Sequence, residues 1–163
     1  MSELSKKIVI LGVGNILLGD EGVGVHVAKE IEKRELPENV EVIDGGTASM
    51  DILSSMKDVD KLIIIDALRC GETPGTVYRL HPEDLLASLD SYVSLHQINV
   101  LEGLILARKT GNAPKETVII GIEPEKIDWG LGVTPEIDKK IPDIINIVLE
   151  EAGNACYGTE TAK

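Results

Sequence analysis

The sequence predicts a three-layer α/β/α sandwich around a mostly parallel sheet of five strands. Short aliphatic runs alternate with segments of helical periodicity along the chain, which is the pattern of strand–helix–strand units. Several of these runs are apolar at every position, as expected for strands that helices cover on both faces. One further run alternates apolar and polar residues, which is typical of an edge or antiparallel strand.

Each expected element follows from a local pattern. The continuous aliphatic run at residues 62–65 indicates a central parallel strand. Thr134 and Pro135 suit the N-cap and first position of a last helix, which Pro142 should kink or restart. The expected strands are residues 6–12, 40–43, 62–65, 76–80 and 117–122. Helices are expected from residue 22, over residues 50–57, from residue 82, from residue 96 to a C-cap at Gly111, and from residue 134.

Length and composition exclude several classes of protein. The 163 residues should form one domain, residues 1–163, with an ordered core over about residues 6–152 and a frayed polar tail at residues 153–163. A net charge of −12 disfavours nucleic acids and anionic membranes as partners. No apolar run reaches the length of a membrane span, and the polar N-terminus does not resemble a signal peptide. We therefore expect a cytoplasmic protein without nucleic-acid or membrane partners.

A glycine-rich stretch joins the first strand to the first helix and ends in two acidic residues. Such loops usually hold phosphate, but Asp20 and Glu21 are badly placed for an anion. A carboxylate at this position can instead cap the helix or bind a metal ion. Both interpretations stay open at this point.

Further polar residues follow the other strands. Asp44 ends the second strand and Asp66 ends the third. Because ligands of open α/β sheets bind beyond the carboxyl ends of the strands, the carboxylates of Glu21, Asp44 and Asp66 should project into one crevice. Their mutual repulsion favours a bound proton or cation. His96 at the start of a later helix adds an imidazole, so the set suits zinc, nickel, iron(II) or manganese. Each residue alone has a structural explanation, and only the joint placement indicates a site.

Competing motifs are incomplete. Gly12 and Gly14 match two glycines of a dinucleotide-binding fingerprint, but Leu17 stands where the third is needed. The chain has no Walker A loop and no Gly-x-Ser-x-Gly elbow of a serine hydrolase. Its two cysteines have no metal or redox spacing. Nucleotide binding is therefore a weaker alternative.

The glycine-rich stretch, GVGNILLGDEGVG at residues 12–24, resembles the signature of the [NiFe]-hydrogenase maturation proteases. Other segments match the pattern of that family in the right order. They are residues 44–47 (DGGT), 66–67 (DA), 94–97 (SLHQ), 121–124 (GIEP) and 134–136 (TPE). The resemblance covers about residues 6–150, and only the tail has no counterpart.

The resemblance implies an α/β/α sandwich with a twisted sheet and an aspartic-type endopeptidase. Such enzymes remove a short C-terminal extension from the precursor of a hydrogenase large subunit after nickel insertion. Matched by position, the metal ligands are Glu21, Asp66 and His96, and Asp44 matches another functional acidic position. The metal is expected to be nickel that arrives in the substrate, and other divalent metals can occupy such a site. Asp44, Glu21 and Asp66 are the expected catalytic residues, and either the metal or a carboxylate such as Asp44 activates the water.

The residues expected to meet the protein substrate are Gly14, Asn15, Gly45 and Gly46. On this interpretation the glycines bring the backbone close to a bulky substrate, and Asp20 is the structural cap of the acidic pair. An alternative function is a non-catalytic, nickel-dependent assembly chaperone of the large subunit, which would keep the crevice but would not cut.

Overall fold

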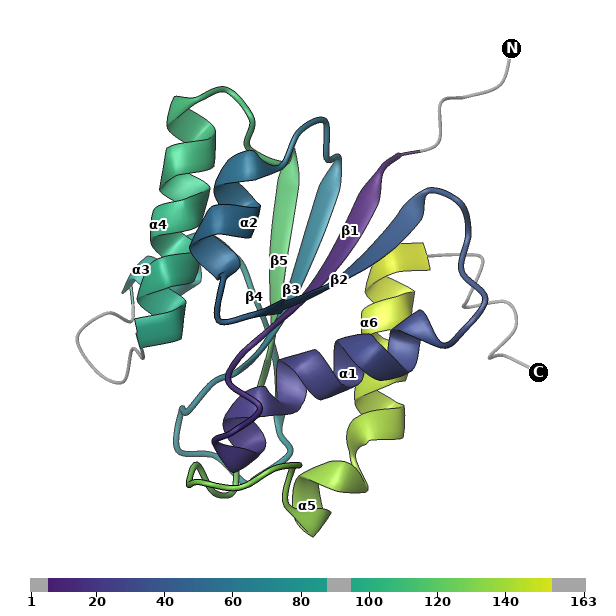
Figure 1. Cartoon of the computed structure of the whole chain (residues 1–163), viewed down its shortest axis with the longest axis vertical. Coiled ribbons are helices and arrows are strands. Elements are labelled where there is room, and N and C mark those ends of the chain that lie inside the picture. The colour runs from purple at the N-terminus through teal and green to yellow at the C-terminus, as the bar shows by residue number, and fades with distance from the viewer. Residues whose placement is uncertain (1–5, 88–94, 154–163) are drawn as a thin grey trace.

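Five strands form one twisted sheet in the order β2-β1-β3-β5-β4, with helices on both faces (Figure 1). The computed structural model describes residues 6–87 and 95–153, without the side chains of residues 95 and 96. The strands are β1 Ile8–Val13, β2 Val40–Gly46, β3 Lys61–Ala67, β4 Val77–Leu80 and β5 Glu116–Ile122. The helices are η1 Gly19–Gly22, a 3-10 turn, and α1 Val23–Glu32, α2 Ser49–Ser55, α3 Pro82–Ala87, α4 Leu95–Lys109, α5 Pro135–Asp138 and α6 Ile141–Gly153. The predicted α/β/α sandwich is confirmed.

The sheet is parallel except at one edge. Strand β1 pairs in parallel with β2 and β3, and β3 pairs in parallel with β5. Strand β4 runs antiparallel to β5 at the edge, which confirms the strand expected at residues 76–80. Because β1, β3 and β5 run the same way, they end at the same side of the sheet, at the bottom of Figure 1. The start of α1 and the loop before α5 lie there as well.

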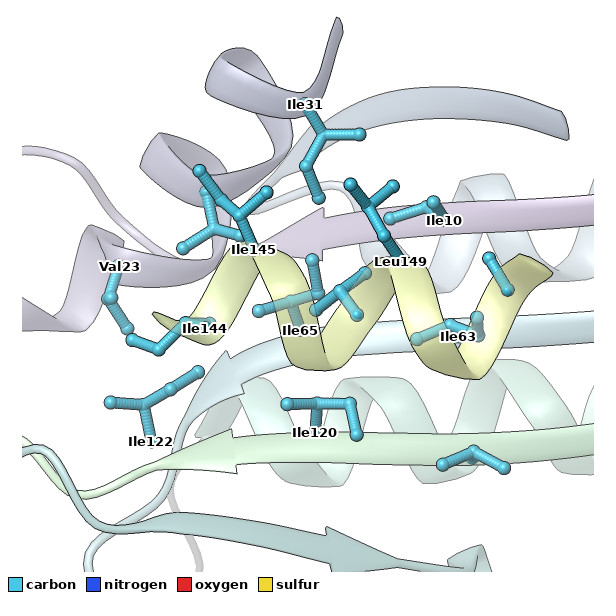
Figure 2. Packing of buried hydrophobic residues seen from close by; sticks show 14 of the residues in the cluster. Ile10, Val23, Ile31, Ile63, Ile65, Ile120, Ile122, Ile144, Ile145 and Leu149 are labelled. Carbon is cyan, nitrogen blue, oxygen red and sulfur yellow. The ribbon is translucent and has the colours of Figure 1, made fainter. Parts of the chain in front are cut away.

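One face of the sheet packs against α1 and α6. Side chains that alternate along β1, β3 and β5 point to this face, where Ile144, Ile145 and Leu149 of α6 cover them (Figure 2). All of these residues are 7% exposed or less, and full burial of each aliphatic side chain contributes about 1.5–3 kcal/mol. The core is aliphatic because the chain has only three Tyr, one Trp and no Phe.

The other face packs against α2, α3 and α4. The intervening residues of the same strands, such as Leu11 and Ile64, are buried here against Leu53 of α2 and Val100 of α4. Strands with both faces covered must be apolar at every position, which explains the continuous aliphatic runs in the sequence.

Glycines allow α1 to lie directly on the backbone of β1 and β3. A Cβ atom at Gly24 would lie 2.1 Å from the carbonyl oxygen of Ile65, and one at Gly12 would lie 2.3 Å from the carbonyl oxygen of Gly24. Real side chains cannot come so close, so only glycine permits this packing. These two glycines therefore serve contacts within the chain, and the expected close approach of substrate does not explain them.

Element ends differ from the expectations where distant partners intervene. Strand β2 continues through Asp44 to Gly46, past the expected end at residue 43, because Gly12 and Val13 of β1 still pair with it. The last helix restarts at Ile141, so the restart near Pro142 is the correct one of the two expected outcomes. Thr134 holds the N-cap position of α5, but its side chain forms no capping hydrogen bond.

The polar tail expected to fray lies outside the described residues from residue 154 onward. In the part of the chain that the structure describes, no helix combines the length and the apolar composition needed to cross a membrane.

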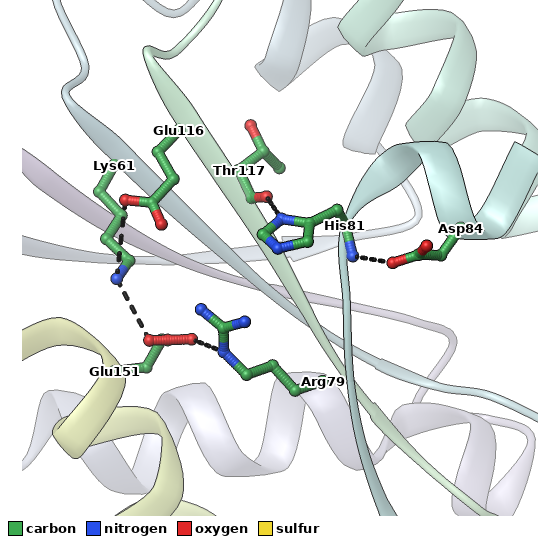
Figure 3. Close-up of polar contacts among 7 residues, drawn as sticks. All are labelled: Lys61, Arg79, His81, Asp84, Glu116, Thr117 and Glu151. Atoms are coloured by element: carbon green, nitrogen blue, oxygen red, sulfur yellow. Dashed lines mark hydrogen bonds and ion pairs between the residues drawn. The ribbon is translucent and has the colours of Figure 1, made fainter.

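Ion pairs fasten α6 to the amino-terminal side of the sheet (Figure 3). Lys61 Nζ lies 3.2 Å from Glu151 Oε2 and 3.8 Å from Glu116 Oε2. Arg79 Nε donates a hydrogen bond to Glu151 Oε1. Burial raises the pKa of Glu151, but the hydrogen bonds from Arg79 and Lys61 outweigh it and hold the pKa below its usual value.

Replacing Glu151 with Gln should lower the free energy of unfolding by about 1–2 kcal/mol at about pH 7. A carboxylate with a depressed folded pKa stabilises the fold above its unfolded pKa, and this contribution disappears as the pH falls through the folded value. The difference between E151Q and the wild type should therefore shrink below a pH of about 4.5, the ordinary glutamate pKa. Urea denaturation across this range measures it, with the exposed Glu150→Gln as control. A difference independent of pH would contradict the assignment.

Candidate functional site

Asp66 is a buried carboxylate at the carboxyl end of the sheet. It lies in β3 on the face that packs against α4 and is 5% exposed. Its Oδ1 accepts a hydrogen bond of 2.8 Å from the N–H of Ala67, and a cavity of about 10 Å³ separates it from Gln97 of α4. Burial raises the pKa of Asp66 well above the usual value for aspartate. The Ala67 N–H offsets part of this rise, and the negative charge of Glu21 adds to it.

Glu21 lies near the end of β3 because the glycine-rich loop folds back on itself. Gly14 has a φ of 134°, and a Cβ atom there would lie 2.1 Å from the carbonyl oxygen of Glu21. This conformation and this contact are open only to glycine. The turn η1 then places Glu21 close enough to the end of β3 for its charge to act on Asp66. The structure therefore places Glu21 within electrostatic range of Asp66, and their joint role in a site stays a prediction.

His96 is the second residue of α4, and its side chain is not described. The next residue, Gln97, is buried and donates from Nε2 to the carbonyl oxygen of Ala67 at 3.3 Å. The start of α4 therefore lies against the end of β3, beside Asp66. Among the side chains that the structure describes, no group of three His, Cys, Asp or Glu could hold a metal ion. The ligand set of Glu21, Asp66 and His96 therefore stays a prediction.

Asp44 lies apart from this pair. Its Oδ2 is 3.7 Å from Lys29 Nζ of α1, and its side chain is 42% exposed. Strand β1 separates β2 from β3, and residue 44 shares the α1 side of the sheet with Val42. The expectation that all three carboxylates project into one crevice is therefore wrong for Asp44, because alternation along each strand sends residues 44 and 66 to opposite faces. Its catalytic role stays a prediction.

The residues expected to bind substrate are engaged in contacts within the chain. Asn15 Oδ1 accepts a hydrogen bond of 2.9 Å from the N–H of Leu17. Gly14 donates from its N–H to the carbonyl oxygen of Gly46 at 2.9 Å, and Gly45 is buried. These bonds join the loops that follow β1 and β2. Contact of Gly14, Asn15, Gly45 and Gly46 with substrate stays a prediction.

Asp20 is fully buried and holds the β5–α5 loop, residues 123–134. Its Oδ2 accepts hydrogen bonds from the N–H groups of Glu125 at 2.9 Å and Lys126 at 3.0 Å. Thr134 donates its N–H to Oδ1 at 2.6 Å and its hydroxyl to Oδ2 at 2.9 Å. Asp20 is structural, as expected. However, it binds a segment 105 residues further along the chain instead of capping its own helix, and it orients the Thr134 hydroxyl by accepting its hydrogen bond.

Glu123 is a second buried anchor, to which the sequence alone assigned no role. It is 2% exposed and accepts hydrogen bonds from the N–H of Cys70 at 2.9 Å and of Glu72 at 2.7 Å. It thereby holds the loop after β3 against the end of β5. The available signal was an acidic residue directly after an apolar strand and before Pro124.

The acidic residues of this edge thus fall into two groups. Asp20 and Glu123 are saturated by backbone donors, which compensate for the burial of their charge. Glu21 and Asp66 repel each other, and Asp66 lies in a largely apolar pocket. Such a pair favours a bound cation or a shared proton. With an imidazole from the start of α4, it would suit a divalent transition metal.

Replacing Asp20 with Asn should lower the free energy of unfolding by at least about 2 kcal/mol, because the amide NH₂ group would face backbone donors. Hydrogen exchange at the amides of residues 125, 126 and 134 should accelerate. The control is Asp128→Asn, in the same loop, whose side chain is 60% exposed. Equal losses in the two variants, measured by chemical denaturation, would contradict the anchoring role.

Replacing Asp66 with Asn should raise the free energy of unfolding of the metal-free protein by about 1–3 kcal/mol at neutral pH. The amide keeps an acceptor for the N–H of Ala67 and removes a poorly solvated charge beside Glu21. Urea denaturation with a chelator present measures the change, and the exposed Asp143→Asn is the control. A loss of stability in D66N would contradict this prediction, because it would show that the Asp66 carboxylate stabilises the metal-free fold.

Comparisons with known proteins agree on one family. The family model described as hydrogenase maturation protease matches residues 25–151. The hydrogenase 2 maturation protease of Escherichia coli K12 is 39% identical over 145 residues, which cover 88% of each chain. The hydrogenase expression/formation protein HupD of Bradyrhizobium diazoefficiens is 33% identical over 152 residues, or 91% of this chain and 79% of that protein.

Solved structures extend the agreement to the fold. The maturating endopeptidase HybD of Escherichia coli has a TM-score of 0.80 at 39% identity, covering 90% of this chain and 94% of that chain. A hydrogenase 2 maturation peptidase from a Thaumarchaeota archaeon has a TM-score of 0.70 at 27% identity, covering 91% and 99%. The chain therefore belongs to the hydrogenase maturation proteases and is a hydrolase of the peptidase class.

Proposed function

We propose that this peptidase removes a short C-terminal extension from the nickel-loaded precursor of a [NiFe]-hydrogenase large subunit. The observation that carries the proposal is the Glu21–Asp66 pair, two mutually repelling carboxylates at the carboxyl end of the sheet, one of them buried. Family membership supports the peptide-bond chemistry. The proposal adds the substrate and its metal.

The residues at this edge suit a metal that arrives with the substrate. Glu21 and Asp66 supply anionic oxygen donors, and a cation between them would relieve their repulsion. His96, in the first turn of α4, would add a nitrogen donor, and nickel accepts such mixed ligands. These three side chains would complete the coordination only when the precursor carries nickel. Binding would then report that nickel insertion is complete, and other divalent metals would occupy the same donors in its place.

Hydrolysis requires a group that takes a proton from water and one that protonates the leaving amine. When bound, the metal supplies a Lewis acid at the site. Glu21 and Asp66 are the acidic side chains beside it. Asp44 is held towards Lys29, so it would act as the base only if the scissile bond lay across the end of β1. We therefore place Glu21 and Asp66 at the reacting centre. Asp44 would instead contact the part of the substrate chain next to the scissile bond.

The alternative function, a chaperone that binds the large subunit without cutting it, has less support, because the matched family and the Escherichia coli K12 relative are named as proteases. Aspartic-type chemistry and a cytoplasmic location stay predictions.

Replacing Glu21 with Gln should slow processing of the nickel-loaded precursor by at least about tenfold, since groups that merely support a metal ligand are already worth 10- to 100-fold. Gln keeps the size of the side chain but removes one anionic donor. Mass spectrometry of the large subunit over time measures the shortening. Nickel-dependent binding of the protein to the precursor gives a second readout.

The matched control is Glu32→Gln, an exposed glutamate at the end of α1. It should process the precursor at the wild-type rate. Wild-type processing by E21Q would refute the ligand assignment, and a wild-type protein that never shortens the nickel-loaded precursor would refute the proposed function itself.

A further inference from the structure

Four large apolar side chains are exposed beside the candidate site. Trp129 and Leu131 in the β5–α5 loop are each 78% exposed, although most residues of their kind are largely buried in proteins. Ile127 in the same loop is 38% exposed, and Leu17 in the glycine-rich loop is 49% exposed. We call these four residues the apolar loop surface.

The two loops that carry this surface are hydrogen-bonded to each other. Gly130 donates from its N–H to the carbonyl oxygen of Leu17 at 2.9 Å, and Gly19 donates to the carbonyl oxygen of Gly130 at 3.0 Å. The carboxylate of Asp20 holds residues 125, 126 and 134 on either side. The exposed side chains therefore stand on a fixed backbone, so little conformational entropy is lost when a partner covers them.

The position of the surface connects it to the reacting centre. Glu21 directly follows Asp20, and both loops lie at the carboxyl end of the sheet, beside the start of α1 (Figure 1). A protein whose chain reaches Glu21 and Asp66 must pass close to these loops. The cavity at Asp66, of about 10 Å³, holds about one water molecule. This cavity is too small for a side chain of the substrate, which favours recognition by the surface around it.

We propose that the apolar loop surface is the docking surface for the hydrogenase large-subunit precursor, and that an apolar patch on the precursor covers Trp129 and Leu131. This inference rests on the proposed function. Exposed Trp residues are frequent among the few side chains that dominate the energy of protein interfaces. The Lys126–Asp128 ion pair at 3.7 Å borders these residues and would form part of a polar rim. A second copy of this chain is a poorer occupant, because two chains of net charge −12 repel each other.

The test measures binding separately from cleavage. The variants are Trp129→Ala and Leu131→Ala, with Leu106→Ala on the exposed surface of α4 as the matched control. The dissociation constant is measured for the nickel-free precursor that still carries its extension, and kcat and KM are measured for the nickel-loaded precursor. We expect W129A to weaken binding at least about tenfold and L131A about fivefold. The precursor KM should rise in parallel, kcat should change little, and L106A should match the wild type.

The outcomes separate the two proposals. Unchanged binding in both W129A and L131A, with equal unfolding midpoints, would overturn the docking surface and leave the protease assignment intact. A dimer that W129A converts to a monomer, with precursor binding unchanged, would also overturn it and make the patch a self-association surface. If W129A and L131A bind the precursor more weakly but the wild-type protein does not cleave it, the docking surface would be supported and the proposed function refuted. A wild-type protein that neither binds the nickel-free precursor nor binds and processes the nickel-loaded one would refute both.

Discussion

The buried carboxylate of Asp20 is the constraint on which the site depends. A buried charge is tolerated only when donors replace the water it loses. Here the donors come from the backbone and hydroxyl of a segment more than 100 residues away. One side chain therefore fixes the glycine-rich loop and the β5–α5 loop relative to each other. These hydrogen bonds also fix the position of the neighbouring Glu21, together with Gly14, where the loop folds back.

The fold class could be predicted from the sequence because it depends on local periodicity. Aliphatic runs at β1, β3 and β5 indicated strands covered on both faces, and the alternation at β4 indicated the antiparallel edge. Element ends were harder, since they depend on distant partners. Strand β2 continues to Gly46 because β1 still pairs with it there. Thr134 occupies the N-cap position of α5, but its hydroxyl donates to the distant Asp20 and forms no capping hydrogen bond.

Some features of the site could likewise be predicted from the local sequence, and others could not. That Glu21 and Asp66 lie at the same side of the sheet could be predicted, because β1 leads to Glu21 and β3 ends at Asp66 in a parallel sheet. That Asp44 and Asp66 point to opposite faces could not, because the continuous apolar run of β3 carries no alternation to show to which face Asp66 points. The glycines were expected to face a substrate, yet Gly12 and Gly24 are required by helix–sheet packing. Glu123 was unassigned because a buried acid at a strand end has the same local sequence as an exposed one.

The β5–α5 loop has a further consequence for how such proteases diverge. Its backbone is fixed from inside by one carboxylate, while its outward positions contribute little to stability. Sequence change at residues 127, 129 and 131 can therefore accumulate without moving Glu21. Duplicated copies of one ancestral enzyme could thus acquire different partners while inheriting the same reacting centre, as happens when variable loops are mounted on a rigid scaffold. Partner choice and chemistry would then evolve as separate traits within a single small domain.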